Sequence, residues 1–541
     1  MSGAGEPEQL EGSYDVHGAA VSEAAPDSAQ HDALVLLTLP GAAPPPLLAQ
    51  VVAAAVELDN ALLTEVSLIK CDLVAGNRLI ISPTGPLTPY DDVRSVYEAV
   101  RAGMRRAVAA GARRPVLALQ ALRPRDLGLE VDDDWSRSEL VALLAALEAL
   151  YIPLEVRESY PERLPRLTAL GVWAPALPAA LQPLLRTAVA LERARALARD
   201  IGGADPERMS PPNVAKYVRD AFADSCVRVR VLDEPDELRR RYPLLAAVAR
   251  AAHAVPRHRG CVIFLDYEPE SYDKTVMLVG KGVTYDTGGC DVKTGGAMAG
   301  MSRDKCGAAA IAGFLKACEL LQPRVRVRAA LGVVRNSVGA DAYVADELLR
   351  SRTGLPVRVG NTDAEGRLVM ADLLAEMAEA AAALVAAGAR THVLTVATLT
   401  GHAARAAGAG YGLALDNAPA RRLAAARALQ AAGAALAEPL ELSRLRREDF
   451  AAHRGQAPGD ALLQAVPLPS TQVDRGHQTP AAFLAMVSGL AGLGACGGAG
   501  GAANVPYTHV DVAASAGCAP APPTAAPLLA LAAYCGLLDR C

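Results

Sequence analysis

Short apolar runs alternate with longer Ala-rich stretches through most of the 541-residue chain. In the first half, runs such as Ala33–Leu39, Leu79–Ser82 and Pro115–Gln120 have the length and composition of buried strands. The stretches Asp91–Ala110 and Ser138–Leu150 have those of helices. A chain that alternates strands and helices in this way covers a sheet with helices. The sequence therefore predicts an α/β fold.

The length of the chain allows two domains of ordinary size. Leu177–Arg199 has a long helical pattern, and residues 202–212 interrupt it with Gly, Pro and Asp. We place a domain boundary before that helix, which predicts an N-terminal α/β domain over residues 33–175 and a second domain over residues 176–541. Residues 1–32 carry seven carboxylates and neither Lys nor Arg, so we interpret them as a disordered acidic N-terminal tail.

The net charge and the cysteine spacing limit which partners and which cellular compartment we expect. The net charge of -5 and a pI near 6.1 give no broad basic surface, so we expect neither a nucleic-acid partner nor an anionic membrane. Thr479–Thr508 lacks Asp, Glu, Lys and Arg, but its seven glycines predict a helix followed by a flexible loop. The ten cysteines form no CxxC pair, which favours a reducing compartment and hence the cytoplasm.

The second half concentrates polar residues in two loops that follow apolar strands. Ligands usually bind beyond the carboxyl ends of strands in an open α/β sheet. The strands are predicted at Thr275–Gly280, Val325–Val334, Leu355–Val359, Thr391–Ala397 and Tyr507–Val512, and the helices at Cys306–Leu321 and Leu368–Ala387. The first loop holds Lys281, Asp286, Asp291, Lys293 and Asp304, and the second holds Asp363, Glu365 and Arg367.

Carboxylates that converge in this way repel one another unless cations lie among them, and hard divalent metals are the natural counter-ions. Beside metal cations, Lys281 would have a lowered pKa and could coordinate a metal as the neutral amine. Lys293 could instead stay protonated and stabilise an oxyanion. Asp363 and Glu365 would point to one side if the backbone were extended there, although residues 361–363 could alternatively cap the helix predicted from Leu368.

Other kinds of site have weaker support in the sequence. The nine histidines include no HExxH motif and lie far apart in the chain, so a structural role is the default for each. The glycines around the first loop permit tight turns, but they form neither a GxxxxGK[ST] nor a GxGxxG pattern. Phosphate binding by a glycine-rich loop is therefore not predicted.

The two loops resemble the leucyl (cytosol) aminopeptidase family. The chain reads NTDAEGRLVMADLL from Asn361, VGKGVTYDTGG from Val279 and MSRDKCGAAA from Met301, and all three segments fit the family pattern. ATLTG from Ala397 and HVDVAASAG from His509 extend the resemblance over roughly residues 190–535. YDTGG and the SRD before Lys305 are closest to the probable-aminopeptidase branch of the family.

The resemblance implies a fold, a reaction and a set of roles. It implies a macro-like α/β domain, followed by a catalytic α/β domain with a mixed sheet flanked by helices. Hydrolysis of the N-terminal residue of peptides would use a water shared by two divalent metal ions per subunit (Zn, Mn, Co or Mg). The implied ligands are Lys281, Asp286, Asp304, Asp363 and Glu365. Lys293 would stabilise the oxyanion, Arg367 would hold a bicarbonate ion, and the substrate would contact Thr398, Leu399, Thr400 and Gly401.

The chain also departs from the family pattern. GGADPERMSPPN stands at the entry to the second domain, where the family has NTPPN or a similar segment, and Lys305–Cys306 replace a hydrophobic residue and Gly. The family implies a homohexamer that acts on peptides with a free N-terminus. The alternative is a catalytically weak or inactive hexameric member with a structural or regulatory role. All of the implied metal ligands are present in this chain, which argues against that alternative.

Overall fold

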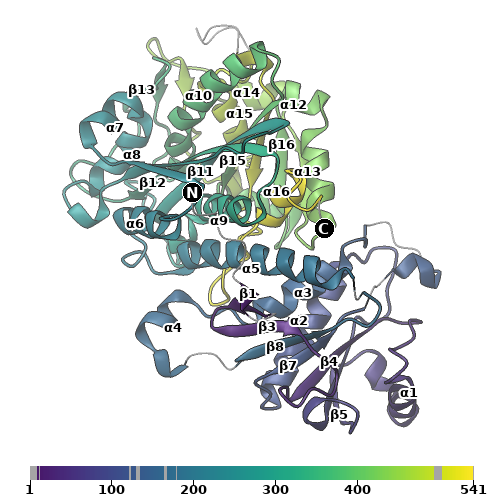
Figure 1. Cartoon of the computed structure of the whole chain (residues 1–541). Helices are drawn as coiled ribbons and strands as arrows, with labels where there is room; N and C mark the ends of the chain where they lie inside the picture. The colour runs from purple at the N-terminus through teal and green to yellow at the C-terminus, as the bar shows by residue number, and fades with distance from the viewer. Residues whose placement is uncertain are drawn as a thin grey trace. The chain divides into compact units, whose positions relative to one another are not determined.

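The computed structural model describes residues 9–10, 13–120, 123–129, 134–163, 167–177, 179–492 and 502–539. The chain forms two compact units, of which the first comprises residues 1–193, 431–438 and 538–541 and the second comprises residues 194–430 and 439–537 (Figure 1). Each unit contains a sheet of eight strands accompanied by helices, which confirms the predicted α/β class. The division between Arg193 and Ala194 falls inside helix α5 (Leu181–Gly203), whereas the sequence placed a boundary before this helix.

The sheet of the first unit is parallel at its centre and antiparallel at its edges. Its strand order is β1-β2-β3-β8-β7-β4-β6-β5, and the pairs from β3 through β6 are parallel. The strands are β1 (Gln9–Leu10), β2 (Ser13–Val16), β3 (Ala19–Glu23), β4 (Ala33–Thr38), β5 (Ser67–Lys70), β6 (Arg78–Pro83), β7 (Pro115–Ala118) and β8 (Ala169–Trp173). The helices are α1 (Ala49–Leu58), α2 (Arg94–Ala109), α3 (Ser138–Glu148) and α4 (Leu154–Ser159).

Part of the predicted disordered tail is ordered, so the expectation for residues 1–32 is wrong where the structure describes them. Strands β2 and β3 pair with each other, and β3 continues the sheet beside β8. Tyr14, Val16 and Val21 are buried, because their alternation along the two strands directs them to one face. The acidic composition concealed this short apolar pattern. Residues 1–8 and 11–12 of the expected tail lie outside the described residues.

The sheet of the second unit is mixed, with order β17-β16-β19-β15-β11-β12-β10-β9. The central strand β11 is parallel to both β12 and β15, and β15 is parallel to β19, so the carboxyl ends of these four strands meet at one edge. The strands are β9 (Arg228–Leu232), β10 (Cys261–Tyr267), β11 (Lys274–Asp286), β12 (Val325–Asn336), β15 (Thr391–Ala397), β16 (Gly412–Asp416), β17 (Leu440–Arg444) and β19 (Tyr507–Asp511). A small separate sheet contains β13 (Leu348–Arg350), β14 (Pro356–Arg358) and β18 (Leu462–Leu463).

Helices α9 (Cys306–Leu321) and α10 (Glu365–Ala386) cover opposite faces of this central sheet (Figure 1). On one face, a Cβ at Gly280 of β11 would lie 2.8 Å from the backbone of Ala308 in α9. On the other face, a Cβ at Gly332 of β12 would lie 2.7 Å from the side chain of Val369 in α10. Glycines in the strands thus allow both helices to approach the sheet closely. The start of each helix is thereby held near the carboxyl end of β11.

The remaining helices of the second unit surround this framework. They are α6 (Pro211–Ala221), α7 (Pro235–Arg241), α8 (Pro243–Ala249), α11 (Gly401–Ala407), α12 (Ala418–Arg422), α14 (Arg447–Ala451), α15 (Gln478–Val487) and α16 (Leu528–Tyr534). The residues of α13 (Ala425–Ala434) are divided between the two units after residue 430. The predicted flexible loop around Gly497–Gly501 lies outside the described residues. Within the part of the chain that is described, no helix combines the length and apolarity that crossing a bilayer requires.

Candidate metal centre

Seven of the eight ionisable residues predicted in the two loops meet in a cavity of about 870 Å³ at the carboxyl edge of the central sheet. The exception is Asp291, whose Oδ2 accepts a hydrogen bond from the backbone N–H of Thr362 at 2.6 Å. Strand β11 supplies Lys281 and Asp286 from its second half, and the loop after it supplies Lys293 and Asp304. Asp363 lies two residues before the start of helix α10, which supplies Glu365 and Arg367. The cavity is lined by these seven residues and by the segment from Thr398 to Gly401 after β15.

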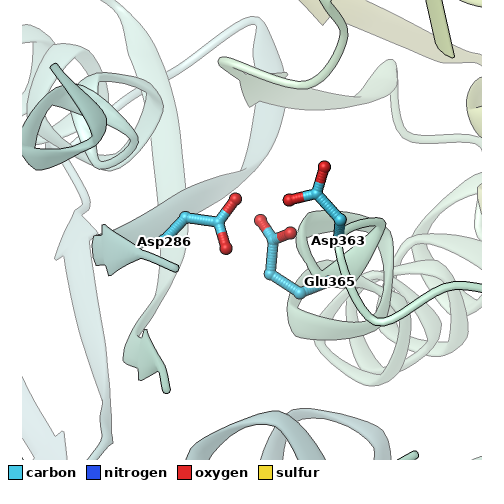
Figure 2. A group of neighbouring side chains, drawn as sticks. All are labelled: Asp286, Asp363 and Glu365. Atoms are coloured by element: carbon cyan, nitrogen blue, oxygen red, sulfur yellow. The ribbon is translucent and has the colours of Figure 1, made fainter. Parts of the chain in front are cut away.

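Three carboxylates form the centre of the site. Asp286, Asp363 and Glu365 each place one oxygen so that these atoms lie within 4.8 Å of one another. The three side chains point toward a common centre from one strand and from the start of one helix (Figure 2). The backbone at Asp363 and Glu365 is not extended, because Asp363 lies in a turn and α10 begins at Glu365 rather than near Leu368. The helix start and the turn before it bring the two carboxylates together instead.

Lys281 joins two of the buried carboxylates. Its Nζ lies 2.7 Å from Asp304 Oδ1 and 2.9 Å from Glu365 Oε1, and it donates a hydrogen bond to the carbonyl oxygen of Thr398 at 3.0 Å. Gly366 makes this position possible, because a Cβ there would lie 2.5 Å from Lys281 Cε. The amine therefore lines the cavity and lies against the first turn of α10.

Lys293 joins the other two carboxylates. Its Nζ lies 2.9 Å from Asp286 Oδ2 and 2.5 Å from Asp363 Oδ1. Burial alone lowers the pKa of each lysine, but the protein's own carboxylates raise both pKa values above the ordinary value. The carboxylate with the largest effect is Asp304 for Lys281 and Asp286 for Lys293. The lowered pKa expected for Lys281 depends on the additional charge of metal cations. With the protein's charges alone, both lysines are ammonium groups.

The carboxylates carry more negative charge than the two lysines can neutralise. Burial raises the pKa of Asp304 to about 6 even though Lys281 opposes the shift, and burial followed by the charge of Asp286 raises the pKa of Glu365 well above its ordinary value. Asp304 Oδ2 is buried and, among the described residues, has no hydrogen-bond partner. Buried carboxylate oxygens that can still accept a hydrogen bond are the ligand atoms that hard divalent cations prefer. These residues therefore fit divalent metal ions.

Arg367 is buried at one side of the cavity, 7% exposed. Its Nη1 donates to the carbonyl oxygen of Gln464 at 3.0 Å, and its Nε is a buried donor that has no hydrogen-bond partner in the described part of the chain. Burial lowers the pKa of Arg367 to about 10, while Glu365 opposes the shift. The guanidinium remains a cation at neutral pH and retains N–H groups for a small anion.

The predicted substrate segment is held by the sheet and by the carboxylates. Thr398 Oγ1 donates to Asp304 Oδ1 at 2.9 Å. The backbone N–H of Leu399 and the hydroxyl of Thr400 both donate to Asp511 of β19, at 3.1 and 2.7 Å. Thr400 also caps helix α11, which begins at Gly401. This segment is thus a fixed wall of the cavity.

Several supporting residues have no predicted role in the sequence analysis. Asn336, at the end of β12, donates from Nδ2 to Asp286 Oδ1 at 2.8 Å and to the carbonyl oxygen of Thr362 at 3.1 Å. The hydroxyl of Tyr343 donates to the same carbonyl at 2.7 Å. Asn336 could have been found, because it too follows an apolar strand. Nothing in the sequence indicated Gln464, whose amide makes four hydrogen bonds with the segment 360–364.

The chain is similar in sequence and in fold to several known proteins. A protein of Caenorhabditis elegans named "Putative aminopeptidase" is 39% identical over 483 residues, which are 88% of each chain. The "Probable cytosol aminopeptidase" of Chlamydia trachomatis is 38% identical over 181 residues, or 33% of this chain and 35% of that one. The solved structure of the bottromycin maturation enzyme BotP in complex with Mn has the same fold, with a TM-score of 0.73, 24% identity and coverage of 94% of this chain and 99% of that one.

The family assignment rests on the catalytic half of the chain. The sequence profile of the cytosol aminopeptidase family catalytic domain matches residues 196–528, which include every ionisable residue of the cavity described above. The similarity to the Caenorhabditis elegans protein extends over most of the chain. The chain therefore belongs to the cytosol aminopeptidase family.

Proposed function

We propose that the protein is a metal-dependent aminopeptidase of the leucyl type, which hydrolyses the N-terminal residue from peptides with a free N-terminus. Residues 176–541 would form the catalytic domain and residues 33–175 a separate N-terminal domain. The observation that carries the proposal is the arrangement of four carboxylates around two lysines in one cavity, because each lysine spans two carboxylates and the negative charge still exceeds the positive. That arrangement suits cation binding, and family membership supports peptide hydrolysis as its use.

The metal ligands in this proposal are Lys281, Asp286, Asp304, Asp363 and Glu365, which would hold two divalent ions (Zn, Mn, Co or Mg). Such ions, when bound, supply the Lewis acidity that makes water nucleophilic at neutral pH and polarises a peptide carbonyl. Asn336 and the backbone N–H of Gly288 both donate to Asp286 Oδ1, at 2.8 and 2.9 Å. These donors leave Asp286 Oδ2 directed to the cavity side, where Lys293 lies.

Lys293 and Arg367 are the proposed catalytic residues. Lys293 Nζ would keep its proton and donate it as a hydrogen bond to the carbonyl oxygen as that oxygen gains negative charge. Arg367 would hold a small anion such as bicarbonate, which could accept the proton of the attacking water. Thr398, Leu399, Thr400 and Gly401 would orient the peptide along the wall that Asp511 fixes.

Family membership also supports two finer proposals. The protein would act in the cytoplasm, and it would assemble as a homohexamer. The second proposal can be checked by the mass of the protein in solution, because one chain has a mass of 56.0 kDa.

Removal of metal is expected to lower hydrolysis of aminoacyl amides by about 100-fold or more, because the Lewis acidity of the ions contributes several kcal/mol to catalysis. The measurement is the rate after exhaustive chelation, with metal content determined by elemental analysis, and again after addition of Mn, Co or Zn. Circular dichroism before and after chelation controls for unfolding. Full activity in verified metal-free protein would reject the proposed function.

Blocking the substrate's amino group is expected to prevent cleavage. A free amine can bind a cation of the site, whereas an N-acetylated amine has no basic lone pair to offer. The rates on aminoacyl amides and on their N-acetyl counterparts should be compared over a panel of N-terminal residues. Equal rates for free and acetylated peptides would show that the cavity does not recognise an amino terminus.

A further inference from the structure

Lys305 directly follows Asp304 and is almost completely buried, 1% exposed. A lysine at such depth normally has an acidic partner. Within the described part of the chain, none of the ion pairs includes Lys305. Its Nζ donates instead to two backbone carbonyl oxygens, that of Ala204 at 3.0 Å and that of Ser302.

The two carbonyls belong to segments that are far apart in sequence. Ala204 immediately follows α5, and carbonyl groups at the end of a helix lack partners within the helix and attract cations. Ser302 lies in the short 3-10 helix Met301–Arg303, and Asp304 is the residue that directly follows this helix. Lys305 therefore fastens the turn that carries Asp304 to the end of α5.

A neighbouring contact fixes the same two segments to each other. Cys306, the first residue of α9, is buried and places its Sγ 3.9 Å from the carbonyl oxygen of Gly202. A Cβ at Gly202 would lie 2.9 Å from that sulfur, so only glycine allows this approach without displacement. The end of α5 and the start of α9 are thus closely packed on either side of Lys305.

Asp304 depends on this anchoring because its own side chain is held at one oxygen only. Oδ1 accepts from Lys281 and Thr398, whereas Oδ2 is buried without a partner in the described residues. We propose that Lys305 is a positioning residue that fixes the backbone of Asp304 so that its carboxylate can hold a divalent cation together with Lys281. This inference rests on the proposed metal binding. The two hydrogen bonds need only two N–H donors, so either protonation state of the amine can make them.

The test is Lys305→Met in the whole 541-residue chain, because methionine retains most of the side-chain volume and removes both donors. After chelation, Mn²⁺ is titrated calorimetrically into the wild type and the variant. The variant is expected to bind Mn²⁺ at one of two sites with a dissociation constant about 10- to 100-fold higher, as for other residues that orient metal ligands, while the second site is unchanged. Unchanged Mn²⁺ binding at both sites would overturn the inference.

Lys316→Met is the matched control. Lys316 lies on the same helix α9 and donates to the carbonyl oxygen of Ala221 at 3.0 Å, at the end of α6, but it does not contact Asp304 or its turn. Its Mn²⁺ binding should equal that of the wild type, and an equal loss in both variants would overturn the inference. If Lys305→Met does not fold, Lys305→Gln is measured with the same expectation, since glutamine is too short to reach both carbonyls. Failure of both to fold would assign Lys305 to global stability and contradict the proposal.

Peptidase activity of the wild type separates the two proposals. Two Mn²⁺ sites in a wild type that hydrolyses no aminoacyl amide would reject the proposed function, while the effect of Lys305→Met on Mn²⁺ binding would still decide the role of Lys305. A wild type that binds no Mn²⁺, Zn²⁺ or Co²⁺ would reject both.

Discussion

Glu365→Gln is expected to abolish hydrolysis of aminoacyl amides and to reduce bound metal to one ion per subunit or fewer. Glu365 is 1% exposed, and its carboxylate shares the central cluster with Asp286 and Asp363. Glutamine has nearly the same shape but carries no charge, and its amide group would direct N–H donors at neighbouring cations. The loss should therefore come from the site and not from a cavity in the core. Metal content by elemental analysis and kcat on leucyl amide are the measurements.

The control for this substitution lies on the same helix. Glu379→Gln removes a carboxylate of α10 that pairs with Arg352 at 3.1 Å and is 58% exposed. Its metal content and turnover should match those of the wild type, because exposed ion pairs contribute little to stability. Wild-type turnover in Glu365→Gln would exclude this carboxylate from the metal centre. Loss of activity in both variants would indicate a general effect on α10.

Lys293→Met is expected to lower kcat by about 10²- to 10³-fold, which corresponds to the ~3 to 4 kcal/mol that one oxyanion donor contributes. The side chain lies between Asp286 and Asp363, so its ammonium is held at the cavity by two carboxylates. Removing this cation leaves those carboxylates free to bind metal. Metal content should consequently stay at the wild-type level while turnover falls.

The separate effects of Lys293→Met on kcat and on KM distinguish the possible roles of Lys293. A transition-state donor lowers kcat and kcat/KM together, whereas a residue that only binds substrate raises KM. Lys216→Met serves as the control, because Lys216 is exposed and pairs with Asp220 away from the cavity. A Lys293→Met protein that loses its metal would make Lys293 a structural part of the metal centre. Unchanged kcat would exclude it from catalysis.

The sequence predicted most accurately those elements whose apolar runs are continuous. Helix α9 and strand β15 have the predicted bounds, because both segments are mostly apolar and each is followed and preceded by a polar residue. Strand β11 extends beyond its predicted end at Gly280 to Asp286, since it continues pairing with β12 through polar positions. The hairpin β2–β3 was missed because acidic residues interrupt its apolar positions.

The amino-acid sequence by itself determined the chemistry available at the site. It placed carboxylates and lysines after buried strands, and the parallel order of an α/β sheet brings such loops to one edge. Only the tertiary structure decided which groups pair. Lys281 and Glu365, or Lys305 and Ala204, lie far apart in the chain, and they meet because α9 and α10 pack on opposite faces of β11 at fixed depth. Such distances depend on the packing of glycines and small side chains, which no local pattern encodes.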